Sequence, residues 1–108
     1  MINIYKEIED GFERIVITYN LGGVEGFVKF YKFEWDRSII INKLIRNQFS
    51  QDQVEAIINN HFLNISEWLD KKFKDEDVTF EDPDYDKLQT WRKNCKDIAD
   101  KALAKYPI

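Results

Sequence analysis

β-Branched and aromatic residues dominate two runs in the first third of the chain, Phe12–Asn20 and Phe27–Trp35, on either side of a turn at Gly22-Gly23. Such a pattern predicts a β-hairpin. Before it, isoleucines from Ile2 onward alternate with polar residues up to Asp10-Gly11, which predicts a further short strand. We therefore expect an antiparallel meander of about three strands.

Two registers of the hairpin are compatible with its glycine turn. A two-residue turn at Gly22-Gly23 pairs Ile17 with Val28 and sets Glu13 opposite Lys32. A three-residue loop with a bulge shifts one strand by a residue and gathers the aromatic side chains on one face. The opposite-charge pair favours the first register, whereas the separation of aromatic from polar residues favours the second.

Helical spacing of apolar residues begins after Trp35. We expect a helix over Ser38–Gln48, capped by Asp36 or by Ser38 itself. The β-branched run Ile39–Ile41 leaves a strand as the alternative for this segment.

Ser50-Gln51-Asp52-Gln53 is a capping box, in which a serine and a glutamine each bond to the backbone N–H of the other. It predicts a helix over Gln51–Leu63. Asn64 is expected to break that helix and to cap a second short one that ends near Lys74.

The last helix is expected to begin at Asp82-Pro83, an aspartate cap followed by proline, and to continue to Pro107. An acidic connector, Asp75–Asp82, precedes it and includes a short extended segment, Val78–Phe80. The predicted fold class is α+β: a single domain over residues 1–108, in which three to four helices pack on one face of the N-terminal meander.

Composition limits the cellular compartments and the kinds of partner that we expect. The chain has 108 residues, of which 44% are hydrophobic and 15% aromatic, enough for one packed core. A net charge of -4 argues against nucleic acid as a partner. Neither a signal peptide nor an apolar run of membrane-spanning length is apparent, and Cys95 is the single cysteine, so we expect a cytoplasmic protein without disulfides or a membrane partner.

The residues that could carry chemistry are few. One histidine, His61, and one cysteine cannot form a multi-histidine or His-Cys metal site. The acidic run that starts at Asp75 places Phe80 where a calcium loop requires glycine. We expect no catalytic, metal or cofactor-binding residue; the alternative is a small ligand-binding domain or enzyme whose site combines His61 with a carboxylate such as Glu67.

The favoured register leaves aromatic residues and arginine on the sheet face that the helices do not cover. The candidate interaction surface comprises Phe12, Arg14, Phe27, Tyr31, Phe33 and Trp35. A monomer rarely exposes so much apolar area in one patch, and aromatic residues and arginine are typical anchors of interfaces. The sequence therefore predicts an interaction protein that binds a protein partner or itself, with a homodimer favoured.

One segment carries a family resemblance. Leu44-Ile45-Arg46 and the following Phe49–Ile57 contain an Ile-Arg pair, an aromatic-Ser cap and an acidic-apolar helix. This pattern, with Trp91, Lys96 and Ala99 further on, resembles small accessory proteins encoded in the structural gene clusters of bacteriophages and prophages. The resemblance covers about a quarter of the chain, brings no catalytic residues, and implies a non-enzymatic assembly role.

Overall fold

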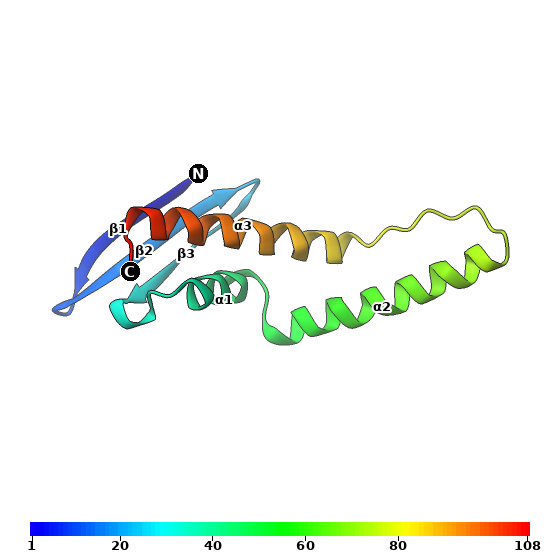
Figure 1. Ribbon diagram of the computed structural model, residues 1–108, viewed down its shortest axis with the longest axis horizontal. Coiled ribbons are helices and arrows are strands. Elements are labelled where there is room, and N and C mark those ends of the chain that lie inside the picture. The colour runs from blue at the N-terminus through cyan, green and yellow to red at the C-terminus, as the bar shows by residue number, and fades with distance from the viewer.

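A computed structural model describes all residues, 1–108, and has the α+β architecture expected from the sequence (Figure 1). Three antiparallel strands come first and lie in chain order in one sheet: β1 (Ile2–Glu9), β2 (Phe12–Leu21) and β3 (Val24–Tyr31). A short 3-10 helix, η1 (Lys32–Glu34), leads to α1 (Arg37–Gln48), α2 (Gln51–Phe73) and α3 (Pro83–Lys105). The molecule is elongated, with extents of 64 × 24 × 22 Å.

The β2–β3 hairpin has the two-residue turn. Gly22 and Gly23 both have positive φ, 60° and 87°, as a tight hairpin turn requires. Ile17 pairs with Val28, so the first register is confirmed. The expected pair of Glu13 with Lys32 is wrong, because β3 ends at Tyr31 and Glu13 binds Lys6 on β1 instead, at 3.3 Å.

One face of the sheet packs against α1 and α3, which lie side by side across it (Figure 1). The side chains of the core come from all three strands, from both helices and from the segment after η1. Its buried members include Ile4, Ile15, Ile17, Tyr19, Phe30, Trp35, Ile40, Leu44, Leu88, Trp91, Cys95, Ile98 and Ala102. Burial of this apolar surface is the main source of stability in a domain of this size.

Local signals set the helix boundaries. The Asp36 carboxylate accepts the backbone N–H groups of Ser38 and Ile39 and begins α1, which decides in favour of a helix here. Asp82 caps α3 by accepting the N–H of Tyr85, with Pro83 in the first helical position.

The helix α2 is continuous over 23 residues, so the predicted break at Asn64 is wrong. An asparagine interrupts a helix when its side chain competes for nearby backbone groups. Here the Asn64 amide reaches out of the helix and donates to Asp82 at 3.1 Å. The predicted extended segment Val78–Phe80 lies in the connector and forms no strand.

The capping box at the start of α2 yields a direct stability test. The Gln53 N–H donates to Ser50 Oγ at 3.1 Å, and the Ser50 N–H donates to Gln53 Oε1 at 2.7 Å. We expect Ser50→Ala to lower the free energy of unfolding by about 1 kcal/mol. Denaturant titration measures this, with the exposed mid-helix Ser66→Ala as control; equal stability of the two variants would argue against the cap.

Candidate interaction surfaces

The helix α2 projects away from the sheet and from α1, and the connector returns beside it (Figure 1). We call α2 together with the connector Lys74–Asp82 the arm. Val54 is the one buried residue of α2, although the helix is about 34 Å long. The arm therefore depends on few contacts with the rest of the fold.

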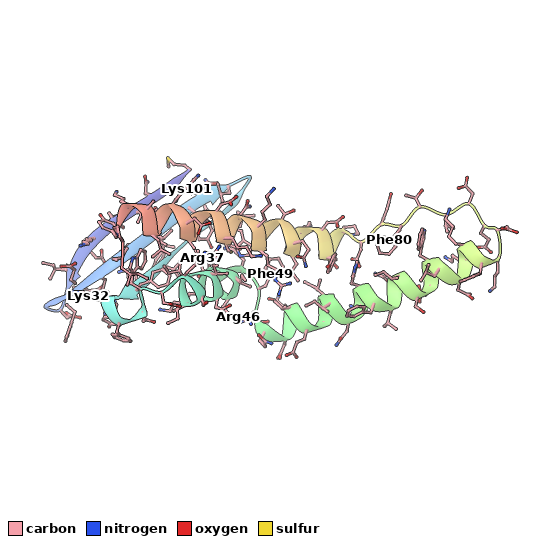
Figure 2. All side chains as sticks on the ribbon, viewed as in Figure 1. Lys32, Arg37, Arg46, Phe49, Phe80 and Lys101 are labelled. Carbon is pink, nitrogen blue, oxygen red and sulfur yellow. The ribbon has the colours of Figure 1, made fainter.

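One side of α2 packs against the connector. Trp68 Nε1 donates to the Val78 carbonyl at 3.2 Å, and the Trp68 ring meets Phe80 edge-on with centroids 5.8 Å apart. Phe80 lies where the connector approaches the start of α3 (Figure 2). We call this the inner side of α2.

Several of the other apolar residues of α2 form a second stripe beside the inner side. They are Ile58, Phe62, Ile65, Leu69 and Phe73, which we call the outer stripe. Leu63 is 62% exposed and lies outside this stripe. Phe62 is 65% exposed, Leu69 44% and Phe73 86%, whereas Ile58 and Ile65 are half-buried at its margin. The sequence predicted two separate helices here, whereas the structure places these positions on one continuous helix. Phe62, Leu69 and Phe73 are exposed along it, and Ile58 packs against the edge of the core.

Most of the sheet residues expected on an interaction surface do lie on the uncovered face. Phe12 meets Tyr31 edge-on, with ring centroids 6.4 Å apart, and Phe33 stacks on Tyr31 at 5.5 Å. Arg14 lies 4.5 Å from the Tyr31 ring centroid and donates to its hydroxyl at 2.6 Å. We call Phe12, Arg14, Tyr31 and Phe33 the sheet cluster.

The structure does not bring the other two predicted residues into that cluster. Phe27 is exposed, but no aromatic ring lies against it. Trp35 is buried: η1 turns the chain inward, so that Trp35 packs on Phe30 and its Nε1 donates to the Tyr106 carbonyl at 2.6 Å. Trp35 is thus a core residue, because the strand alternation that placed it outside ends at Tyr31.

Charged side chains cover the middle of the same sheet face. Lys29 binds Glu7 and Glu9, each at 2.9 Å, and Arg14 also binds Glu9, at 3.2 Å. The hydrogen bond from Lys29 is the main reason that the pKa of Glu9 is lowered, and the hydrogen bond to Glu7 is the main reason that the pKa of Lys29 is raised. Long aliphatic stems of such residues shield apolar surface, and Val16 beneath them is only 1% exposed.

His61 lies on the inner side of α2 and joins the arm to α3. Its ring stacks on Tyr85, with centroids 3.4 Å apart and planes at 6°. Its Nδ1 is 2.9 Å from Asp82 Oδ2, the same oxygen that accepts from Asn64. The side chains of His61 and Asp82 are 14% and 8% exposed.

Through these contacts His61 is part of the packing between the arm and α3. Its carboxylate partner is Asp82 and not Glu67, which is exposed. Cys95 lies 13 residues beyond Asp82 along α3, about 20 Å away, so the two helices do not bring it to His61. The Cys95 thiol is completely buried, and burial raises its pKa to about 12, which keeps it protonated and unreactive.

Acid should weaken the junction between the arm and α3. The pKa of Asp82 is lowered, first by its hydrogen bond with His61 and further by those from Asn64 and from the Tyr85 N–H. A carboxyl whose pKa is lowered on folding stabilises the fold above its unfolded pKa and loses that contribution as the pH falls through the folded value. We expect Asp82→Asn to be less stable than the parent at neutral pH, with the difference shrinking below about pH 4.

Thermal unfolding of both proteins across the acid range tests this expectation. The difference between them isolates Asp82, because the other acids are common to both. A difference that stays constant from neutral to acid pH would show that Asp82 does not titrate in this way.

No group of three or more histidine, cysteine, aspartate or glutamate side chains is placed to hold a metal ion. No helix is both long enough and apolar enough to cross a membrane.

The fold and surfaces define a class: a small α+β protein with a three-stranded sheet, two covering helices and a projecting helical arm. No protein-family model, no curated protein and no solved structure matches the chain.

Proposed function

We propose that the protein is a small non-enzymatic interaction protein that docks the outer stripe of α2 against a protein partner. The observation that carries the proposal is a 23-residue helix with one buried residue and several exposed large apolar side chains. Most of the stability of a helix in a protein comes from packing of its apolar face. A partner on the outer stripe would supply that packing.

The energetic gain of such docking is considerable. Full burial of a phenylalanine or leucine side chain stabilises by roughly 1.5–3 kcal/mol. Phe62 and Phe73 are mostly exposed and Leu69 nearly half, so that burial of all three would contribute several kcal/mol before the costs of association.

The sheet cluster supports a second, smaller contact surface. Phe12 and Phe33 are exposed beside Arg14 and Tyr31, the residue types that often anchor interfaces. The charged network of Lys29 limits this surface to one end of the sheet. The outer stripe is therefore the stronger candidate.

An assembly role is consistent with the resemblance to phage and prophage accessory proteins, and we extend the proposal to it. A projecting arm and a second aromatic cluster on one small chain would allow two neighbours to be joined. Joining two neighbours requires complementary apolar surfaces and no catalytic residues.

Site-specific photo-crosslinking in the cells that make the protein tests the proposal. A photoreactive amino acid replaces Phe62 in one variant, Phe33 in a second, and the exposed polar Lys101 on α3 in a third. We expect a discrete crosslinked species from position 62 that a second substitution, Leu69→Asp, removes. Crosslinking no stronger at position 62 than at position 101 would overturn the proposed docking surface.

A further inference from the structure

The outer stripe has the spacing of a helix–helix seam. Ile58, Phe62, Ile65 and Leu69 follow one another at intervals of four, three and four residues. That is the alternation of the two core positions in a coiled coil. Glu55 precedes Ile58 by three residues and Lys72 follows Leu69 by three, so both continue the same seam with charged side chains.

Two copies of this seam are complementary when they run in opposite directions. If two copies of α2 run antiparallel with the centre between residues 63 and 64, Ile58 lies opposite Leu69 of the second copy and Phe62 lies opposite Ile65. Each of these layers occurs twice by two-fold symmetry, as an interface between identical chains requires. The next layer outward places Glu55 opposite Lys72 at both ends.

Charge selects this orientation over a parallel one. Parallel pairing would place Glu55 against Glu55 and Lys72 against Lys72, and both contacts would be repulsive. Neither side chain is used in an ion pair within the chain: Glu55 accepts from Gln51, and Lys72 lies 5.9 Å from the Trp68 ring centroid. The first two turns of α2 carry Asp52 and Glu55 and no lysine or arginine, whereas its last turn carries Lys71 and Lys72.

The shape of the molecule also fits antiparallel pairing. In this register the end of one arm, near Glu76, reaches Gln51 of the second copy, where the rest of that fold begins. The two sheets therefore lie beyond opposite ends of the paired helices and do not collide. Parallel pairing would bring both sheet layers to the same end, beside each other.

We infer that the partner of the outer stripe is a second copy of this chain, paired antiparallel along α2. This inference rests on the proposed function and names its partner. Aromatic side chains bury roughly 150–250 Å² each, so the paired stripes would bury on the order of 1,000 Å² in total. That area lies near the lower limit of specific interfaces, so a dimer that dissociates on dilution is expected.

Light scattering on a size-exclusion column, over a concentration series, measures the self-association. We expect the mass to rise from monomer toward dimer in the parent. Phe62→Asp should remain a monomer throughout. Phe33→Asp changes an exposed phenylalanine of the sheet cluster in the same way and should dimerise like the parent.

Charge reversal tests the register itself. Glu55→Lys and Lys72→Glu should each weaken dimerisation, by roughly fivefold or more, because each places like charges at both ends of the seam. The double variant Glu55→Lys/Lys72→Glu restores opposite charges and should dimerise to within about threefold of the parent. Circular dichroism confirms that each variant is folded.

The outcomes separate this inference from the proposed function. A folded parent that stays monomeric at all concentrations, or a double variant no better than the single ones, overturns the antiparallel dimer. In that case a crosslink from position 62 to a different protein would leave the proposed function standing. Absence of any crosslink from position 62 would overturn both.

Discussion

Trp35→Ala is expected to destabilise the fold by about 3–5 kcal/mol, the usual cost of removing a large aromatic side chain from a core. Trp35 is 7% exposed, packs on Phe30 with ring centroids 5.5 Å apart, and donates to the Tyr106 carbonyl. Truncation leaves a cavity between β3 and the end of α3 and removes the donor from that carbonyl. Denaturant titration measures the loss.

Phe33→Ala is the matched control, because Phe33 lies two residues away and is 83% exposed. Its one aromatic contact is the stack on Tyr31, so its removal should cost less than about 1 kcal/mol. Similar losses in the two variants would contradict the assignment of Trp35 to the core and of Phe33 to the surface.

Hydrogen exchange is expected to divide the molecule into two parts. In dilute solution, amides of the second half of α2 should exchange roughly a hundredfold or more faster than those of β2 and of the C-terminal half of α3. The reason is that the arm contacts the core only through the first half of α2, at Val54, Ile57 and Ile58. Ile17 of β2 and Ile98 of α3 are completely buried. Raising the protein concentration should slow exchange in α2 alone, because dimerisation covers the outer stripe.

Mass spectrometry of peptic fragments over a dilution series resolves this difference. Fragments from β2 provide the internal reference, since their protection should not depend on concentration. Protection of α2 that equals that of β2 at the lowest concentration would show that the arm is stable without a partner.

Local chemistry made much of the fold predictable. The glycine pair at 22–23 and the β-branched runs beside it defined the hairpin, and the structure has the register in which Ile17 pairs with Val28. Asp36, Ser50 and Asp82 each begin a helix by accepting backbone N–H groups, and this is visible from the residue type and its position alone.

What escaped prediction depends on contacts between distant residues. Trp35 turns inward and donates to a carbonyl 71 residues later in the chain. Asn64, where a break was predicted, donates from within α2 to Asp82. Burial of Val16 depends on Lys29 meeting two glutamates of β1. None of these pairings follows from the spacing of residues within one element.

The sequence predicted the apolar positions of the outer stripe but not their exposure, for a related reason. Periodicity identifies the apolar positions of a helix, but it does not show which of them lack a neighbour. The intervals that link Ile58, Phe62, Ile65 and Leu69 could have been recognised as one seam if Asn64 had not been interpreted as a break.

The antiparallel pairing of α2 can be measured as a distance. Ala56 and Leu63 are exposed residues one heptad apart, so they occupy equivalent positions around the helix. Spin labels on Ala56→Cys and, separately, on Leu63→Cys report the distance between the two copies by pulsed electron paramagnetic resonance. Cys95 does not interfere, because its thiol is completely buried.

Antiparallel pairing about residues 63–64 separates the two labels along the helix axis by about 2 Å at position 63 and about 22 Å at position 56. The predicted result is therefore a distance at position 56 that is clearly longer, by roughly 10 Å, than at position 63. Equal distances at the two positions would indicate parallel pairing, and the absence of any distance between labels at dimer-forming concentrations would indicate that α2 does not pair with itself. Either result would contradict the antiparallel arm dimer.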